Sequence, residues 1–382
     1  GGDHFRLAAD ATLNRPSIPG SSTLQTNTNL KVNVLNREMN RQYGFSAFYN
    51  KVWGRGHSSS VILSRSGFSR EISDYIRSQD QGFGTLFNLD TALVTNNVRE
   101  RSLRIENILN LKDGHQLEFG GGIYSNKTSF ERTQVYKNLS PVDAMSEYQN
   151  DRGFVYFQDN LPVSRNLILK SGLRISMVSQ TGKFHIEPRL NASYRLASDL
   201  KFSASWGVYN QFMYKMASVD RDNNFSYHWV ANNAEIPVLH ANHLVAGLNF
   251  YRKGFTMNIE PYYKTTGNLT RLIFSDKPVI HGNLPDFYRV RGDARTTGID
   301  VYLKKDFGRH AVWASYTLSK TSERLARNRS ALPAWQPAPH DQRHELKMAG
   351  IMNIRNFYLS ADYVYGSGME ILKKVFEDET GN

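Results

Sequence analysis

One short segment carries the residue types of a metal site. In His340-Asp-Gln-Arg-His344, alternate residues share one face of an extended strand, so His340, Gln342 and His344 would lie on one side. Two histidines on one face could ligate a transition metal, because imidazole is a common zinc ligand. The other interpretation is a strand start at which Asp341 and Arg343 make polar contacts. We expect the second, and we predict no metal and no cofactor.

Two long polar segments, 213–241 and 324–340, hold residues suited to ligand binding. The first contains Tyr214, Arg221, His228 and Trp229, and the second contains Arg329 and Trp335. Aromatic rings beside arginine suit flat or anionic ligands, because rings stack and guanidinium groups form charge-assisted hydrogen bonds. Two alternatives stay open. Tyrosine and tryptophan also form the aromatic belt at a membrane surface, and clustered arginines also contact the phosphates of lipopolysaccharide.

No arrangement of residues indicates catalysis. The chain has no cysteine, which excludes thiol nucleophiles, disulfides and cysteine-ligated metals. No Ser/His/Asp or paired-carboxylate arrangement can be argued. Gly120-Gly-Gly122 is not a phosphate loop, because Phe119 and Ile123 continue a strand pattern and no helix follows. Such small residues more often let a neighbouring group approach closely. We predict that the chain is not an enzyme.

Composition excludes two further classes of protein. The 382 residues include 47 Lys+Arg and 35 Asp+Glu, a net charge of +12. Nucleic-acid binding is not expected, because the basic residues are scattered without a basic run or a recognition motif. No stretch approaches the roughly 18 uninterrupted apolar residues of a membrane-spanning helix. The first five residues, Gly1–Phe5, carry no visible export signal.

Alternation of apolar and polar residues dominates the chain. In residues 200–208, one face carries Leu200, Phe202, Ala204, Trp206 and Val208, and the other carries Lys201, Ser203, Ser205 and Gly207. Residues 255–263 and 299–304 follow the same period of two, which is the pattern of half-buried strands. Each strand is therefore apolar on one side and polar on the other. We expect Trp206 to face lipid and leave the side of Trp313 open.

Connections between the predicted strands alternate in length. Short ones with Gly, Asp or Asn lie at 112–115, 197–200, 252–254, 306–309 and 354–356, and long polar ones lie at 71–97, 132–151, 213–241, 268–293 and 324–340. This alternation is typical of bacterial outer-membrane barrels. The alternative, a soluble sandwich or propeller, has strands nearer 5–6 residues. We predict an all-β fold, a large antiparallel transmembrane β-barrel with about 15–17 strands, wide enough to enclose water or a plug.

From about residue 98 onward, the chain resembles the barrel of TonB-dependent outer-membrane receptors, in particular the kind common in Bacteroidetes. The order and spacing of many short segments carry the resemblance. These are Arg101–Asn107, Gln116–Gly120, Gly153–Asp159, Gly172–Arg174, Glu187–Leu190, Ser205–Phe212, Ile236–Leu239, Glu260–Lys264, Thr297–Asp300, Trp313–Ser319, Asp341–Leu346 and Val364–Gly368.

The resemblance implies a 22-stranded barrel with an N-terminal plug and a TonB box, through which the TonB complex admits a scarce nutrient. We find neither plug nor TonB box, nor the final strands. Residues 1–382 are therefore expected to be one partial barrel domain. The implied localisation is the bacterial outer membrane. The implied partners are membrane lipid and lipopolysaccharide, the TonB complex, an extracellular nutrient and a surface lipoprotein.

The predicted function is TonB-dependent import of a siderophore, vitamin, peptide or glycan. The first alternative is a passive pore or structural barrel without energy coupling, and the second is a soluble carbohydrate-binding β protein. The substrate itself is out of reach, because specificity lies in variable loops.

Overall fold

The computed structural model describes residues 4–14, 20–25, 30–54, 56–80, 86–135, 142–219, 225–274, 287–326 and 333–369. These form one 3-10 turn, η1 (Lys112–Gly114), and nineteen strands in a single sheet. The strands are β1 (His4–Asn14), β2 (Gly20–Gln25), β3 (Leu30–Val52), β4 (His57–Asp80), β5 (Leu86–Asn110), β6 (Gln116–Val135), β7 (Val142–Pro162), β8 (Leu167–Val178), β9 (Phe184–Ala197), β10 (Leu200–Gln211), β11 (Met213–Val219), β12 (Phe225–Ala231), β13 (Leu239–Arg252), β14 (Phe255–Phe274), β15 (Phe287–Phe307), β16 (His310–Ala326), β17 (Gln336–Pro337), β18 (His344–Ile354) and β19 (Phe357–Gly366). No helix among the described residues is long and apolar enough to cross a membrane.

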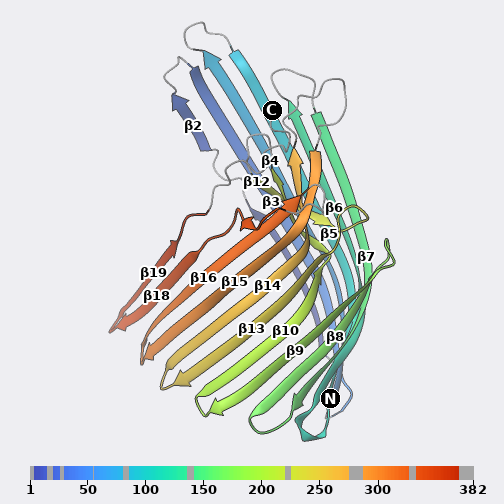
Figure 1. The fold of residues 1–382 in the computed structure, drawn as a ribbon, viewed down its shortest axis with the longest axis vertical. Coiled ribbons are helices and arrows are strands. Elements are labelled where there is room, and N and C mark those ends of the chain that lie inside the picture. Colours follow the sequence, from blue (N-terminus) through green and yellow to red (C-terminus); the bar gives the residue numbers. More distant parts are fainter. Residues whose placement is uncertain are drawn as a thin grey trace.

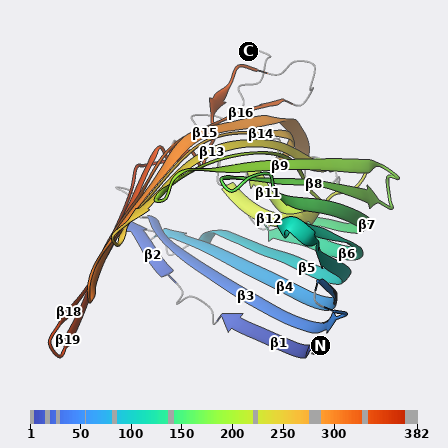
Figure 2. The ribbon, with the colours of Figure 1, turned by 90° about the horizontal axis from the view of Figure 1, so that it is seen from below.

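The sheet is antiparallel between chain neighbours and curves strongly, so that one face is concave (Figure 1, Figure 2). Its order runs β3 to β10 and then directly to β13, because Gln211 of β10 pairs with Leu239 of β13. It continues through β14, β15 and β16 to β18 and β19. Strands β1 and β2 pair with successive parts of β3 and together make one crossing. This confirms the predicted large antiparallel barrel.

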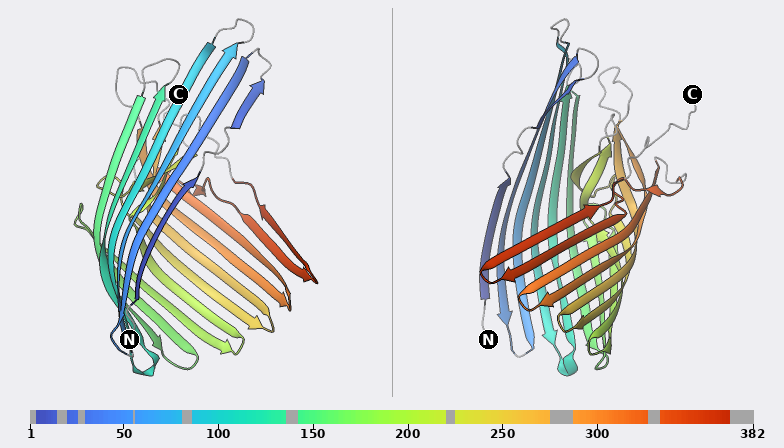
Figure 3. Two further views of the ribbon diagram at one scale, coloured as in Figure 1. Left: turned by 180° about the vertical axis from the view of Figure 1, so that it is seen from behind. Right: turned by 90° about the vertical axis from the view of Figure 1, so that its left-hand side faces the viewer.

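The predicted short connections are confirmed. Each joins two neighbouring strands, and these turns gather at one end of the sheet, near the N-terminal residues (Figure 3). In the turn between β13 and β14, Lys253 and Gly254 have φ of 46° and 73°. Positive φ at both central residues marks the two-residue turn that matches the twist of a hairpin. With β11, β12 and the two-residue β17 set aside, fifteen crossings are described, within the predicted range.

Three predicted loops are in large part strand. Residues 71–97 were expected to form a polar excursion, yet β4 and β5 stay paired from His57–Leu109 to Gln79–Leu86. The segments 132–151 and 268–293 are likewise shortened by extensions of the strands on either side. The tall group β3–β7 rises beyond the other strands in Figure 3. Polar side chains on both faces do not end a strand, because backbone pairing continues wherever a partner strand continues.

The convex face carries a continuous band of exposed apolar side chains. Leu63, Leu103 and Ile123 are neighbours across β4, β5 and β6. They are 52%, 37% and 60% exposed. Trp206 lies between Leu190 and Leu244 in the same band. An apolar surface of this extent is stable only against lipid or another protein, which agrees with the expected lipid-facing side of Trp206. Trp313 lies on the opposite, polar face. It shares this face of β16 with Thr317, whose hydroxyl donates a hydrogen bond to Asp300.

Two glycines of the Gly120–Gly122 run let aromatic rings lie flat on the concave face. A Cβ at Gly122 would meet the Leu103 carbonyl oxygen and, at 3.0 Å, the ring of Phe154. A Cβ at Gly120 would lie 3.0 Å from the Tyr156 ring. The sequence-based expectation that these glycines admit a close neighbour is therefore confirmed.

We predict that Gly122→Val destabilises the barrel, because the added side chain must displace both a backbone carbonyl and a buried ring. Overpacking of this kind costs about 1–3 kcal/mol. The temperature at which the folded, fast-migrating gel band of the full-length protein converts to the unfolded band should fall by several degrees. Gly153→Ala on the neighbouring strand is the control, because its Cβ would have only a 4.0 Å contact. Equal transition temperatures for both variants would contradict the packing argument.

Candidate functional site

A hairpin leaves the barrel wall and lies inside its concave face. Because β10 pairs directly with β13, strands β11 and β12 do not lie between these two strands of the wall. They pair with each other from Met213–Ala231 to Val219–Phe225. Seen from below, the two strands lie within the curve of the sheet (Figure 2). This pair, called the lumen hairpin below, is not one of the membrane-crossing strands.

Side chains from four successive wall strands hold one edge of the lumen hairpin. Arg70 of β4 donates to the Tyr227 carbonyl at 3.2 Å. Asn96 of β5 accepts from the Trp229 N–H at 2.7 Å and donates to its carbonyl at 3.1 Å. Thr128 of β6 accepts from the Ala231 N–H at 3.0 Å, and Asn150 of β7 donates to the Asn232 side chain at 2.5 Å.

These contacts replace a partner strand. The exposed edge of a strand presents unpaired N–H and C=O groups, and β12 offers them at Tyr227, Trp229 and Ala231, every second residue. A two-residue step along a strand is about 6.7 Å and neighbouring wall strands are about 4.8 Å apart. A strand that crosses the wall obliquely therefore meets one new wall strand for every two residues.

The other edge of the lumen hairpin reaches a distant part of the wall. Ala217, Ser218 and Val219 of β11 pair in parallel with Arg271, Leu272 and Ile273 of β14. Beside this junction, Arg271 donates to both carboxylate oxygens of Glu323 at 2.8 and 2.9 Å. Their side chains are only 6% and 7% exposed. The hairpin thus connects β4–β7 with β14 across the interior.

An apolar cluster seals the hairpin against the wall. Its buried members come from β7, the hairpin, the segment returning to β13, β13 itself and β14: Tyr148, Tyr214, Met216, Val230, Ala231, Ile236, Leu239 and Leu272. Met216, Val230 and Ile236 are at most 2% exposed. Fully burying each such side chain contributes about 1.5–3 kcal/mol. The hairpin is therefore held by an apolar core as well as by polar contacts at its edges.

Three residues predicted to contact ligand belong to this hairpin. Tyr214 is 3% exposed, and burial raises its pKa to about 12. His228 is 4% exposed, stacks on Phe130 at 4.1 Å, and has its pKa lowered by burial to about 4. Trp229 is held by Asn96, with the Lys215 ammonium 5.4 Å from its ring centre. Their direct role in the structure is docking, and ligand contact by these residues stays a prediction.

The remaining predicted residues fall in two groups. The Trp335 ring contacts two guanidinium groups, with its centre 4.4 Å from that of Arg295 and 4.6 Å from that of Arg324. These contacts attach the segment before β17 to the wall. Arg221 and Arg329 lie outside the described residues.

The two-histidine segment has the polar contacts expected of a strand start. Asp341 accepts from the Thr321 N–H at 2.6 Å and from Arg343 at 2.8 Å. His344 makes a 2.8 Å hydrogen bond with the Tyr316 hydroxyl. Within the described parts of the chain, no group of three or more His, Cys, Asp or Glu residues could hold a metal ion. The predicted strand start with Asp341 and Arg343 in polar contacts is confirmed.

Below the lumen hairpin, a stack of rings and guanidinium groups lines the concave wall. Arg152 of β7 lies between Phe212, at 4.6 Å, and Tyr124 of β6, at 4.4 Å. The Tyr124 ring is 5.6 Å from Phe154, over which Arg174 of β8 lies at 3.9 Å. We call these five residues the arginine ladder.

A buried carboxylate continues this line onto β9 and β10. Glu187 is 4% exposed, accepts from Arg189 at 3.1 Å, and lies 3.8 Å from Arg174. It also accepts from the Asn210 N–H at 2.9 Å. Arg189 in turn lies over Tyr209, 5.0 Å from the ring centre. Sequence reasoning missed these wall residues. Their only signal was Arg-x-Phe-x-Tyr and Glu-x-Arg spacing on the polar face of predicted strands.

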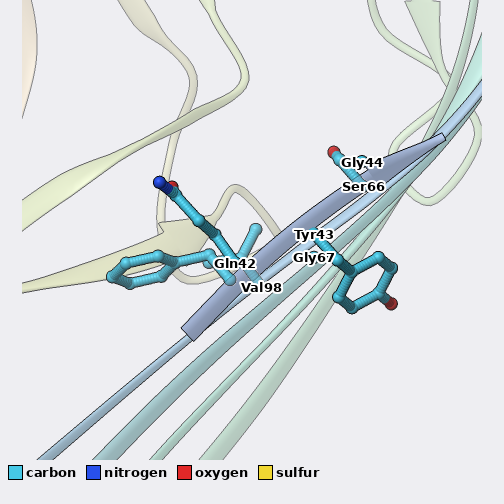
Figure 4. A pocket seen from close by; sticks show the side chains of 7 residues that line it. Gln42, Tyr43, Gly44, Ser66, Gly67 and Val98 are labelled. Carbon is cyan, nitrogen blue, oxygen red and sulfur yellow. The ribbon is translucent and has the colours of Figure 1, made fainter. Parts of the chain in front are cut away.

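A shallow hollow of about 350 Å³ lies farther along the wall, on β3, β4 and β5. Gln42, Phe68 and Val98 are cross-strand neighbours that line its inner side (Figure 4). Tyr43 points to the other face, where its ring covers Gly67. The hollow carries no charged group and offers less chemistry than the ladder.

The fold and this wall define a class of protein: a large antiparallel barrel with a polar interior partly occupied by its own chain. Residues 2–368 match the family described as TonB dependent receptor-like, beta-barrel. The chain therefore belongs to the family of TonB-dependent receptor β-barrels. No curated protein matches it by sequence.

Solved structures show the same fold at low sequence identity. BauA, the ferric preacinetobactin receptor from Acinetobacter baumannii, aligns with a TM-score of 0.57 and 10% identity, over 94% of this chain and 60% of that one. The ferric citrate transporter FecA aligns with a TM-score of 0.54 and 11% identity, over 95% of this chain and 66% of that one. The RagAB peptide importer in its closed-closed state aligns with a TM-score of 0.52 and 11% identity, over 88% of this chain and 48% of that one. The present chain spans about half the length of that importer chain.

We predict that acidification loosens the lumen hairpin. The pKa of docked His228, about 4, lies below the ordinary value of 6.5, so the undocked hairpin binds the proton more readily. Docking is strongest above pH 6.5 and weakens as the pH falls toward 4. Between pH 7 and pH 5 the loss is about 2 kcal/mol, or about 30-fold. The rate of amide hydrogen exchange of residues 225–231, corrected for the intrinsic exchange rate at each pH, measures this loss of docking stability.

His228→Phe is the matched control, because phenylalanine keeps the stack on Phe130 and cannot take up a proton. This variant should lose most of the pH dependence while its hairpin stays docked at pH 7. An unchanged pH dependence would show that another group is responsible.

We predict that Asn96→Leu frees the hairpin edge, because leucine leaves the Trp229 N–H and C=O unpaired. An unpaired buried polar group costs about 1–3 kcal/mol. Amide exchange at Trp229 should accelerate about tenfold or more. Asn97→Ala is the control, because its side chain lies on the opposite face of β5. Equal exchange in both variants would rule out the proposed anchoring by Asn96.

Proposed function

We propose that this chain is the barrel of a TonB-dependent outer-membrane transporter that imports a nutrient. The observation that carries the proposal is the lumen hairpin, docked across the interior of a barrel of the receptor family. A passive pore works best with a clear channel. A hairpin sealed by an apolar core and four wall side chains instead favours a passage that opens only when work is done on it.

The mechanism follows from the two faces of the sheet. Hydrocarbon chains of membrane lipid and lipopolysaccharide contact the apolar band. Extracellular loops capture the ligand, and a plug supplied elsewhere in the full-length protein closes the lumen. Pulling by the TonB complex then deforms the plug. The polar concave wall offers the ligand hydrogen-bonding groups along its path. In this role the chain acts as a transporter and catalyses no reaction.

The cargo belongs to a nutrient class that porins do not admit. Structures with this fold include a peptide importer, a ferric citrate transporter and a siderophore receptor. A peptide or glycan ligand would fit best with a surface lipoprotein as a lid, and a siderophore or vitamin would need none. The contacts proposed for the ligand include Trp229 on the lumen hairpin and Trp335 on the β16–β18 connection, both of which are only partly buried.

The test uses the full-length gene product expressed in its own bacterium. Outer membranes are extracted in detergent, and boiled and unboiled samples are compared by gel mobility. Growth on single nutrients is then compared between a strain lacking the gene, the complemented strain, and a complemented strain lacking TonB. A faster unboiled band together with growth that needs both gene and TonB supports the proposal. Gene-dependent growth without TonB would indicate the passive pore.

We predict that tethering the lumen hairpin to the wall blocks transport. Because the chain has no cysteine, Asn150→Cys with Asn232→Cys supplies the only two thiols in this part of the protein. The two side chains meet at 2.5 Å, within reach of a short bis-methanethiosulfonate reagent. Gene-dependent growth should stop after cross-linking and resume after reduction. Each single variant, treated identically, is the control, and unimpaired growth of the cross-linked variant would show that the hairpin stays docked during transport.

A further inference from the structure

The arginine ladder differs from the other charged pairs on the concave wall. Arg70 is bound to Glu38 at 2.9 Å, Arg324 to Asp293 at 3.0 Å, and Arg271 to both oxygens of Glu323. In each pair a carboxylate neutralises the guanidinium group, so these pairs need no further partner. They join neighbouring elements of the wall.

Arg152 is held in a different way. Its guanidinium group lies between the rings of Tyr124 and Phe212, and it forms no ion pair with any carboxylate in the described part of the chain. Its Nε is buried and has no hydrogen-bond partner. An aromatic ring offers a guanidinium group no carboxylate or carbonyl oxygen, so these ring contacts leave the N–H groups of Arg152 available to an anion. A buried charge without a counter-charge is costly, so this arrangement favours an anion at that edge.

Arg174 repeats the arrangement one strand farther on. It lies 3.9 Å over Phe154, and its buried Nε also has no hydrogen-bond partner. Its nearest carboxylate, Glu187, is 3.8 Å away and is engaged at shorter distance by Arg189 and by the Asn210 N–H. Arg174 and Arg189 thus share one buried carboxylate, and Arg152 pairs with none. The local excess of positive charge lies at the base of the lumen hairpin, because Phe212 directly precedes β11.

We propose that Arg152 and Arg174 form a binding site for a compact anion, a carboxylate or phosphate group of the transported ligand. This assignment rests on the proposed transport function. Arginine suits the task because its planar fork binds both oxygens of such a group. The rings hold each guanidinium group in place before the anion arrives, so little side-chain freedom is lost on binding. The ligand class that fits is an organic polycarboxylate or a phosphorylated compound.

The anion has two sources with the same chemistry. It belongs either to the ligand, as proposed, or to an acidic side chain elsewhere in the full-length protein. A soluble anion can be added and removed, whereas an acidic side chain is always present. The experiment therefore needs one arm for each source.

The first arm measures binding of radiolabelled citrate and inorganic pyrophosphate to full-length protein in detergent by equilibrium dialysis. Wild-type protein should bind at least one of these probes in the micromolar to millimolar range. Because hydrogen bonds to charged groups are strong, Arg152→Gln or Arg174→Gln should each weaken binding about tenfold or more. Arg174→Lys keeps the positive charge but loses the planar fork of the guanidinium group. Its affinity for the probe should therefore lie between those of the wild type and of Arg174→Gln. Arg252→Gln, at the end of β13 and with a side chain 65% exposed, should bind the probes as wild type does.

The second arm uses Arg152→Lys in full-length protein, treated with a carbodiimide that joins an amine directly to a contacting carboxylate. Peptide mass spectrometry locates any cross-link. Probe binding that is lost in the glutamine variants, without a cross-link from position 152, supports the proposal. A cross-link to an acidic residue of the same protein, without probe binding, overturns the ligand assignment. Neither binding nor a cross-link overturns the site altogether.

Gel mobility of each variant before boiling checks that the barrel has folded. The requirement of wild-type growth for TonB is measured separately and does not involve the probes. A failed anion site would therefore leave the proposed transport function standing, and the two failures are distinguishable.

Discussion

Hydrogen bonding of the backbone in a lipid environment is the constraint on which the structure depends. Within the hydrocarbon layer no water can pair with a free N–H or C=O group, so strands that cross this layer must be paired. In the sheet from β3 to β19, each crossing strand pairs with its neighbour along the sheet. Pairing then fixes the faces: Leu103 and Ile123 point to lipid, and Asn96 and Thr128 point inward. The residues that hold the lumen hairpin and those of the arginine ladder thereby lie on one concave surface.

The same constraint explains the lumen hairpin. A two-stranded hairpin is marginally stable alone, and both of its outer edges need partners. Here β14 supplies a short parallel pairing on one edge. On the other edge, side chains of Arg70, Asn96 and Thr128 take the place of a strand. These contacts are individually modest, at about 0.5–1.5 kcal/mol for a typical hydrogen bond. An element held in this way can be stable at rest and still be released by mechanical work on the barrel interior.

The period-two pattern was enough to predict the barrel, its faces and its turns. The lipid-facing side of Trp206 followed from the apolar residues that alternate with polar ones around it. The turn at Lys253-Gly254 followed from the preference of glycine for turns. The hairpin could not be predicted, because β11 and β12 become a lumen element only through wall residues 54 to 157 positions away. Hence Tyr214 and His228 were placed in an exposed loop, whereas they are buried. The arginine ladder joins β6, β7 and β8 through register, which a single sequence does not reveal. The extension of β4 and β5 into the segment 71–97 could not be predicted either, because it depends on the two strands staying paired with each other beyond the membrane.

The most direct test of this account is residue-resolved hydrogen exchange of the full-length protein in detergent at pH 7. The account predicts that the amides of Trp229 and Ala231 exchange as slowly as those in the middle of β5, because wall side chains hold them. If they exchange as fast as the amides of the turn at 253–254, the hairpin is a free loop, and the occupied lumen on which the proposed mechanism rests is wrong.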